Sequence, residues 1–319
     1  MNILFYMIST SLLVMYMFRG KRLEKYVKVL VEKISEFISS SLNIKKEPIS
    51  KLLGFLFYIG ESIVVVLFIQ YFYIGNFTVP TGSMKPKIMP QDKYLADMVS
   101  YNFFEPKRGQ IIIFKSPTNE IHFCKRLIAF SGEKVKVGND NKIYINGQKL
   151  ETNNVYYKYT SIDNIIINSL MDDSEWLVPK KGDSIQLHFA LFRYFTEKGE
   201  ILKDLWEMRD TLNKMTEREA LNFLKNLKRN FKLEISKSRV ILNDKDLTGI
   251  IVDEDILLKL IKGDKVNLEE DYYFALGDNS LKSEDSRYWG FIKKSRLKGR
   301  PILRWWPFER INFVYSYPY

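Results

Sequence analysis

The sequence predicts a mainly β protein: an antiparallel β-sheet domain with a partly helical insertion, preceded by two transmembrane helices. Two long apolar runs near the start indicate the helices. Short runs rich in β-branched and aromatic residues, divided by turn pairs, indicate the sheet. A charged stretch with leucines at helical spacing indicates the insertion. With 319 residues, of which 46% are hydrophobic, the chain can bury one large core or two smaller ones.

The first apolar run covers residues 1–18 and is close to the shortest helix that crosses about 30 Å of hydrocarbon. Its nearest positive charges, Arg19, Lys21 and Arg22, follow the run. A secretory signal peptide has its charges before the apolar stretch and a small-residue cleavage site after it. We therefore expect an uncleaved first transmembrane helix whose N-terminus lies outside the cytoplasm.

The second apolar run, residues 52–77, is long enough to span a membrane although Glu61 and Gln70 lie inside it. We interpret Glu61 as a structural residue near the headgroups or against the first helix, in preference to a functional site. Residues 19–51, between the two runs, contain nine basic and four acidic residues, which is typical of a cytoplasmic loop. Residues 78–319 should then form an extracytoplasmic domain.

Charge and cysteine content argue against two classes of function. The formal net charge is +11, but the charges beyond residue 77 are spread without a dense Lys/Arg tract, so we expect no nucleic-acid partner. Cys124 is the only cysteine, so no intramolecular disulfide can form. With His122 and His188 it offers too few ligands for a Cys/His zinc site, and we expect no metal and no cofactor. The apolar setting of Cys124 favours a buried small hydrophobe over a reactive thiol.

The domain after the second run contains short segments typical of strands, divided by turn pairs such as Ser131-Gly132 and Asn146-Gly147. The segments are KYLADMVSY, GQIIIFK, HFCKRLIAF, EKVKV and KIYING. They predict an antiparallel sheet.

An insertion at about 151–270 interrupts this pattern. The stretch from about Leu191 to Lys232 is charged, and its leucines recur at helical spacing. Thr216 and Glu219 match the capping-box pattern of a helix start. The stretch therefore predicts a helical insertion in the sheet.

Two pairs of similar segments flank the helical stretch. Residues 142–150 resemble residues 239–247, and residues 179–187 resemble residues 260–268. Both pairs are hairpin-like. They indicate either duplication of a small β unit or the chance recurrence of short strand-turn-strand sequences.

A turn that carries a serine directly follows the second apolar run. In VPTGSMKP, residues 79–86, Pro80 and Gly82 bend the chain before Ser83, and Pro86 prevents regular structure after it. Such a turn can present a nucleophilic hydroxyl, and it can equally be an ordinary juxtamembrane turn.

A serine nucleophile needs a base, and neither histidine lies in a recognisable nucleophilic setting, so a Ser-His-Asp triad is poorly supported. A lysine can serve instead if an apolar pocket lowers its pKa from about 10.4 towards the working pH. Lys125 lies in the apolar segment FCKRLIAF and fits this need. A lysine in such a segment can also simply extend its amine from a strand edge.

A dense polar loop between two apolar strands is the third notable segment, YYFALGDNSLKSEDSRYWGFI at residues 272–292. Gly277 and Asp278 give its turn. Asp285 and Arg287 can form a charge-assisted pair that locks the loop. A loop this polar is unusual for packing alone.

Taken together, these segments resemble the signature boxes of bacterial type I signal peptidases (leader peptidases), a family of serine proteases with a Ser-Lys dyad. The resemblance covers roughly residues 77–150 and 270–310. It rests on five segments in the family's order, namely TGSMKP, RGQIIIFK, CKRLIAFSGEKV, GDNSLKSEDSRYWGF and KGRPILRWWPFERI.

The resemblance implies a β fold of the signal-peptidase type and a serine endopeptidase that removes signal peptides from translocated preproteins. Ser83 would attack the scissile carbonyl and Lys125 would take its proton. The main-chain N–H of Ser83 and the hydroxyl of Thr81 would form the oxyanion hole. Ser283 would orient the lysine amine.

The resemblance also implies a location and a supporting loop. Asp278, Asp285 and Arg287 would hold the loop that carries Ser283. The protein would reside in the bacterial cytoplasmic (inner) membrane near the secretion translocon, with the lipid bilayer as a partner and the catalytic domain on the extracytoplasmic face. Gln110 and the run at 280–282 depart from the family's usual residues without removing a catalytic group. Two alternatives stay open: a Ser-Lys protease with a narrow dedicated substrate, and an inactive homologue that binds peptides.

Overall fold

The protein is described by a computed structural model, and its chain forms two compact units. One comprises the residues up to Asn76 together with Asp97–Phe104, and the other comprises Phe77–Ala96 and the residues from Glu105 onward. The structure describes residues 24–117, 121–138, 142–150, 175–196, 199–230, 234–243, 245–248 and 253–314.

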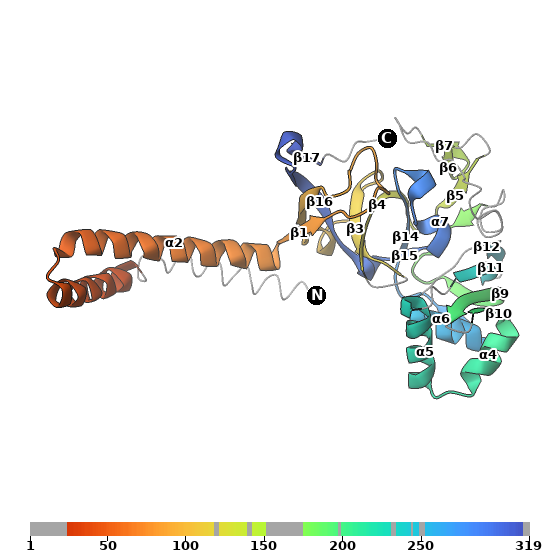
Figure 1. The fold of residues 1–319 in the computed structure, drawn as a ribbon. Helices are drawn as coiled ribbons and strands as arrows, with labels where there is room; N and C mark the ends of the chain where they lie inside the picture. The colour runs from red at the N-terminus through yellow and green to blue at the C-terminus, as the bar shows by residue number, and fades with distance from the viewer. Residues whose placement is uncertain are drawn as a thin grey trace. The chain divides into compact units, whose positions relative to one another are not determined.

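The first unit is helical in the part that the structure describes. Residues 24–42 form a helix, α2 follows at Lys46–Phe72, and η1 is a short 3-10 turn at Ser100–Asn102 (Figure 1). Within the described residues, Lys46–Gln70 is the one stretch long and apolar enough to cross a membrane, and its most apolar 18 residues have a mean hydropathy of 2.4. The predicted first span, residues 1–18, lies outside the described residues and stays a prediction.

The second predicted span differs from α2 at both ends. The helix begins at Lys46 instead of residue 52 and ends at Phe72 instead of residue 77, because Ile74–Thr78 form strand β1. An apolar run with β-branched and aromatic residues suits a strand as well as a helix, so hydropathy alone did not locate this boundary.

The second unit is built on an eight-stranded sheet in the order β1-β2-β16-β3-β4-β14-β15, with β17 paired to β16. The pairs β16–β3, β3–β4, β4–β14, β14–β15 and β16–β17 are antiparallel, as the sequence predicts. The strands are β2 (Lys93–Asp97), β3 (Ile111–Lys115), β4 (His122–Ala129), β14 (Tyr272–Leu276), β15 (Ile292–Lys293), β16 (Leu297–Trp306) and β17 (Asn312–Phe313).

The core of this unit lies at the centre of the sheet. All five residues of β14 are buried, which requires cover on both faces of the strand. Trp176, 1% exposed, covers one side by packing its ring 5.8 Å from the rings of both Phe274 and Phe291. Phe114 of β3 packs 5.6 Å from Trp289 in the same way.

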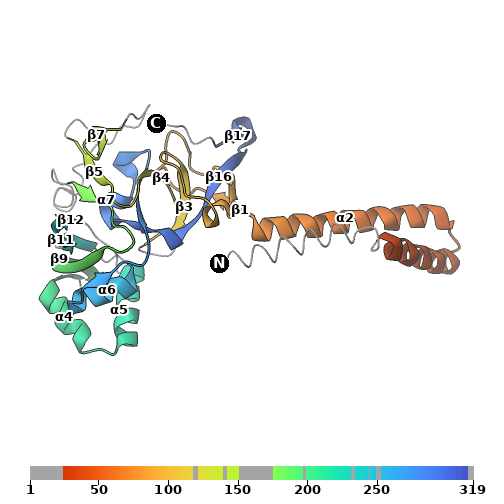
Figure 2. The ribbon, with the colours of Figure 1, turned by 180° about the vertical axis from the view of Figure 1, so that it is seen from behind.

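A small four-stranded sheet adjoins the main one, in the order β7-β6-β5-β8. Its strands are β5 (Lys134–Val137), β6 (Ile143–Ile145), β7 (Gln148–Lys149) and β8 (Trp176–Leu177). In both views this sheet and the β16–β17 hairpin lie at opposite ends of the main sheet (Figures 1 and 2).

In its described residues the insertion combines a third sheet with three helices. The sheet has the order β10-β9-β11-β12, with β13 paired to β9, and helix α6 packs against α4, α5 and β9 (Figure 1). Its elements are β9 (Ser184–Thr196), β10 (Gly199–Asp204), α4 (Leu205–Asn213), α5 (Glu217–Asn230), β11 (Glu234–Leu242), β12 (Lys245–Thr248), α6 (Glu254–Lys262) and β13 (Val266–Asn267).

The predicted helical stretch from Leu191 to Lys232 is correct only in its second part. Residues 191–196 and 199–204 belong to strands β9 and β10, and helix begins at Leu205. The β9 sequence is rich in aromatic and aliphatic residues that favour strands, whereas helical leucine spacing starts further along. The capping box at Thr216 is confirmed, because the Thr216 N–H donates to Glu219 Oε2 at 2.8 Å and the Glu219 N–H donates to the Thr216 hydroxyl oxygen at 3.4 Å.

The two pairs of similar segments have different structures. Residues 142–150 and 239–247 both contain antiparallel hairpins, and each turn has an asparagine with positive φ, Asn146 at 51° and Asn243 at 48°. The second pair, residues 179–187 and 260–268, is not hairpin-like, because residues 260–262 form the end of helix α6. Its two members instead pair with each other, Ile185 opposite Val266.

Candidate active site

The loop that follows β1 holds Ser83 in a fixed turn. Val79 N–H donates to Asp92 O at 3.0 Å and closes the loop at its ends. Met84 and Ile88, 0% and 1% exposed, pack into the core and anchor the loop between those ends. Ser83 is itself only 7% exposed, so the predicted bend is held by packing on both sides of the serine.

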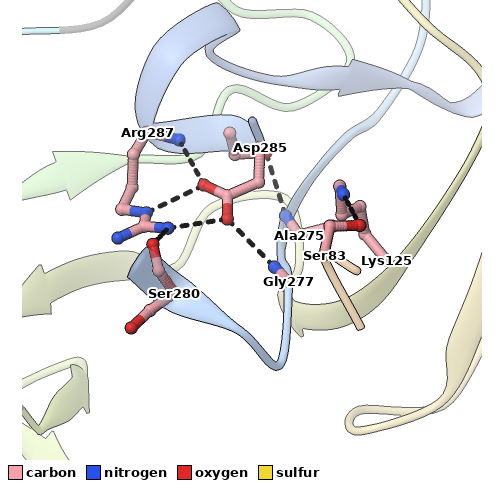
Figure 3. A network of polar contacts seen from close by, with 8 residues as sticks. Ser83, Lys125, Ala275, Gly277, Ser280, Asp285 and Arg287 are labelled. Atoms are coloured by element: carbon pink, nitrogen blue, oxygen red, sulfur yellow. Dashed lines mark hydrogen bonds and ion pairs between the residues drawn. The ribbon is translucent and has the colours of Figure 1, made fainter. Parts of the chain in front are cut away.

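Lys125 reaches Ser83 from strand β4. Its Nζ donates to Ser83 Oγ at 2.7 Å, and the lysine is 4% exposed (Figure 3). Burial lowers the pKa of Lys125 because the charged amine loses water, while the negative charges of Asp285 and Glu284 oppose the shift. The structure thus brings together the two side chains that the sequence singles out as nucleophile and base.

The predicted oxyanion donors lie beside the serine hydroxyl. Thr81 Oγ1 donates to Ser83 Oγ at 3.3 Å. Across the described part of the chain, no main-chain hydrogen bond uses the Ser83 N–H as donor. Both donors are therefore close to the nucleophile, and the N–H is available to an incoming group.

The polar loop after β14 contacts the Ser83 turn through main chain. A Cβ at Gly277 would lie 2.0 Å from Ser283 Oγ and 2.6 Å from Ser83 O, so only glycine fits there. Ser283 is 4% exposed, and its Oγ has no hydrogen-bond partner. The structure therefore places Ser283 next to the Ser83 turn without joining it to Lys125 Nζ, and its predicted role as orienter stays a prediction.

Asp285 and Arg287 form the pair that the sequence predicts. Arg287 Nε and Nη2 donate to the two oxygens of Asp285 at 2.8 and 2.9 Å, and Nη2 also donates to Ser280 O at 2.8 Å (Figure 3). Asp285 in turn accepts from Gly277 N–H at 3.0 Å. The pair therefore fixes the start and the middle of the loop, with the short helix α7 (Ser286–Trp289) beginning directly after Asp285.

This arrangement suits acyl transfer by a serine. It contains a fixed hydroxyl, a desolvated amine within hydrogen-bond distance and an unused main-chain donor, which are the parts of an activated nucleophile. Among the residues that the structure describes, no cluster of three or more His, Cys, Asp or Glu side chains is arranged to hold a metal ion.

Comparison with protein families identifies the group to which these segments belong. The family model described as "Signal peptidase, peptidase S26" matches residues 52–201 and 225–306, which is more than half of the chain. The chain belongs to the signal peptidase S26 family.

Individual signal peptidases are similar to this chain over lengths that range from about a third to about three quarters of it. Signal peptidase I of Aquifex aeolicus is 26% identical over 247 residues, covering 76% of this chain and 79% of the relative. Signal peptidase I of Rickettsia akari is 36% identical over 124 residues, covering 32% of this chain and 46% of the relative. A crystal structure of a signal peptidase I from Enterococcus faecalis aligns at 22% identity with a TM-score of 0.26, covering 62% of this chain and 97% of that one.

Membership of the family confirms the resemblance predicted from the five segments. The chain is a serine endopeptidase of the signal peptidase I type, and signal-peptide-bearing preproteins are its substrates. The mainly antiparallel β architecture agrees with this assignment.

One ion pair of this signal peptidase was only half identified from sequence. Arg126 donates through Nε and Nη2 to the two oxygens of Asp278 at 2.7 and 2.5 Å, and through Nη1 to Gly109 O at 2.7 Å. Sequence analysis named Asp278 as structural but left out Arg126. The available signal was an arginine inside an apolar strand, because a buried charge needs a partner.

Asn279 is a second residue that sequence analysis left out. Its main-chain N–H donates to Ser83 O at 2.9 Å, and its Nδ2 donates to Gly82 O at 2.9 Å. Nothing in the run GDNSLKS distinguishes this asparagine from its polar neighbours. Only the fold shows that it contacts the nucleophile turn.

Proposed function

We propose that this chain is a membrane-bound signal peptidase I that cleaves by a Ser83–Lys125 dyad. The proposal rests on one observation, the 2.7 Å contact between Lys125 Nζ and Ser83 Oγ in a site where both residues are buried. Burial favours the neutral amine, and a neutral amine hydrogen-bonded to a hydroxyl can act as its general base.

The reaction has two steps that balance with these groups alone. Ser83 Oγ attacks the scissile carbonyl carbon, its proton passes to Lys125 Nζ, and the carbonyl oxygen becomes an oxyanion. The carbon–nitrogen bond then breaks, and Lys125 returns the proton to the leaving amine. Water attacks the resulting ester with Lys125 again as base, the bond between the acyl carbon and Ser83 Oγ breaks, and Lys125 returns the proton to Ser83 Oγ, so the signal peptide leaves with a C-terminal carboxyl group.

The oxyanion would be held by the Ser83 N–H and the Thr81 hydroxyl. The available N–H and the short distance of Thr81 from Ser83 support this role. Ser283 would orient Lys125 once substrate excludes water from the site. The substrate would bind as an added strand, with small side chains at the first and third positions before the cut.

The anchor places this chemistry at a membrane. The apolar helix α2 supports a span in the bilayer, and we propose a further span at residues 1–18 with the basic stretch 19–51 in the cytoplasm. The catalytic unit then lies on the extracytoplasmic face of the bacterial inner membrane, close to the translocon from which preproteins emerge.

Two variants test the dyad. Ser83→Ala and Lys125→Ala should each abolish cleavage of a preprotein in detergent, because each removes one reacting group, while circular dichroism and thermal unfolding show an intact fold. The double variant His122→Ala/His188→Ala is the control, and it should keep activity if no histidine is the base. Cleavage by either single variant would reject the Ser-Lys mechanism.

The same assay separates the alternatives. Wild-type protein that binds preproteins without cutting them would support an inactive peptide-binding homologue. Cleavage of one preprotein out of a panel with varied residues before the cut would support a dedicated protease. Retention of the buried Ser83–Lys125 contact favours an active enzyme over the first alternative.

A further inference from the structure

Asn279 holds the two main-chain carbonyls on either side of the nucleophile. Its N–H donates to Ser83 O and its Nδ2 donates to Gly82 O, both at 2.9 Å. The two carbonyls belong to the two peptide groups that flank the Ser83 Cα. One residue of the polar loop thus fixes the main chain of Ser83 without contacting its hydroxyl.

The side-chain contact also sets the direction of the Ser83 N–H. The peptide bond between Gly82 and Ser83 is trans, and in a planar trans peptide the C=O and the N–H point in opposite directions. Gly82 O accepts from Asn279 Nδ2 on one side and from Lys85 N–H, at 3.2 Å, within its own turn. The Ser83 N–H at the other end of the same peptide therefore cannot rotate freely.

The same hydrogen bond strengthens the N–H as a donor. A carbonyl that accepts hydrogen bonds withdraws electron density from its own peptide nitrogen, and chains of such bonds reinforce one another in a low-dielectric site. The Asn279 amide lies in a partly buried position, where this polarisation is weakly screened.

We infer that Asn279 is a positioning residue for the oxyanion hole, with its side-chain amide aiming and polarising the Ser83 N–H through the Gly82 carbonyl. The inference rests on the proposed function, because it assigns a role to the N–H of the proposed nucleophile. It predicts that Asn279 acts on the transition state and leaves substrate binding and the base unchanged.

Two substitutions test the side-chain amide and leave the main-chain contact in place. Asn279→Ala removes Nδ2 and should lower kcat about 10- to 100-fold, because an oxyanion donor is misaligned but not deleted. Asn279→Asp keeps the shape of the side chain but places a carboxylate oxygen against Gly82 O. It should lower kcat at least as much as Asn279→Ala. A residue that only packs the loop would tolerate Asn279→Asp.

Two readouts separate positioning from structural damage. In Asn279→Ala, KM should change by no more than about twofold, and the pH at half-maximal kcat/KM should stay at the wild-type value, because Lys125 is untouched and no charge is added. A substrate-like peptide aldehyde ending in alanine, whose adduct with Ser83 carries the oxyanion, should bind more weakly in proportion to the loss of kcat/KM. The cleaved signal peptide should bind as it does to wild type.

Asn243→Gly is the matched control. Asn243 also makes two side-chain hydrogen bonds to its surroundings, with Ser184 N–H and Asp183, but it lies in the insertion sheet, and glycine suits its positive φ of 48°. It should keep wild-type kcat and aldehyde affinity. Wild-type kcat in Asn279→Asp, or a shifted pH midpoint or a loss confined to KM in Asn279→Ala, would each overturn the assignment. Cleavage by Ser83→Ala would instead overturn the proposed function itself.

Discussion

At Lys125, burial and neighbouring charges act in opposite directions on the same proton. Burial lowers the pKa of the amine, and the carboxylates of Asp285 and Glu284 raise it. Burial has the larger effect, so the pKa of Lys125 is lower in the folded state than in the unfolded chain. The folded state therefore binds this proton less readily. The free energy of unfolding should therefore increase as the pH rises from the folded-state pKa of Lys125 to the ordinary pKa of lysine.

Activity should follow the neutral form of Lys125. We expect kcat/KM to rise with pH through the lowered pKa and to level off below the ordinary pKa of lysine. Glu284→Gln removes a charge that raises the Lys125 pKa, so the rise should move to lower pH. The control is Glu175→Gln in the small sheet, which should leave the profile unchanged. A rise only near the pKa of free lysine would contradict the proposed base.

The buried Arg126–Asp278 pair should matter more for stability than an exposed pair. Both side chains are at most 8% exposed, and breaking a buried pair leaves an uncompensated charge. Asp278→Ala should therefore lower the unfolding free energy by about 3–5 kcal/mol in urea titrations. Glu175→Ala, which breaks the exposed pair with Lys134, should cost no more than about 1 kcal/mol. Equal losses would contradict this account.

Ser83 and Lys125 were predictable because five segments together resemble one family, although each residue alone also suits an ordinary turn or strand, and the structure places the two side chains in contact. Arg126 and Asn279 contact partners 152 and 197 residues away in the chain. The buried arginine indicates that a partner is needed, but no local pattern identifies the partner of either residue. The surroundings of Ser283 could not be predicted from sequence either, because they depend on the conformation of the loop. Its Oγ has no hydrogen-bond partner among the described residues.

At the level of elements, the strands that carry the site were predicted well. β3 and β4 coincide with the apolar segments around Ile112 and Lys125, and alternation along β4 separates Lys125 from Arg126. Segments 74–78, 191–196 and 199–204 were misassigned, because short apolar or mixed runs suit both helix and strand. Whether such a run forms a helix or a strand is decided by the strands with which it pairs in the folded protein.

Helices α4 and α5 of the insertion begin with capping boxes. Asp204 accepts from Glu207 N–H at 2.9 Å at the start of α4, and Glu207 accepts from Asp204 N–H at 3.2 Å. Asp204→Ala should lower the unfolding free energy of the insertion by about 1 kcal/mol, measured by urea titration. Asp204→Asn, which keeps an acceptor, should lower it less. Cleavage of a short peptide should be unchanged in both, and equal stability of all three proteins would argue that the cap contributes nothing.

For the whole molecule, the sequence predicts an orientation that the fold alone does not test. The basic stretch 19–51 should be cytoplasmic and the catalytic unit extracytoplasmic.

Cysteine labelling tests this orientation in a Cys124→Ala background. A membrane-impermeant maleimide should label Trp206→Cys in intact spheroplasts, because Trp206 is 67% exposed on the catalytic unit. It should label Lys33→Cys only after the membrane is made permeable. Cys124 in the wild type is the control, since burial raises its thiol pKa to about 12 and should keep it unreactive. The reverse labelling pattern would overturn the topology.

The absence of space at Gly277 also limits how this enzyme can diverge. A single added methyl group would collide with Ser283 and with the carbonyl of Ser83 at once, so it would disturb two segments of the candidate site that are 200 residues apart in the chain. No compensating change in one segment alone relieves both collisions. If position 277 and the exposed positions of the same loop are randomised and the variants are selected for protein secretion, the surviving variants should carry glycine at position 277. The exposed positions should accept many different residues. We therefore expect the sequences of the Ser83 turn and of the loop after β14 to vary only together.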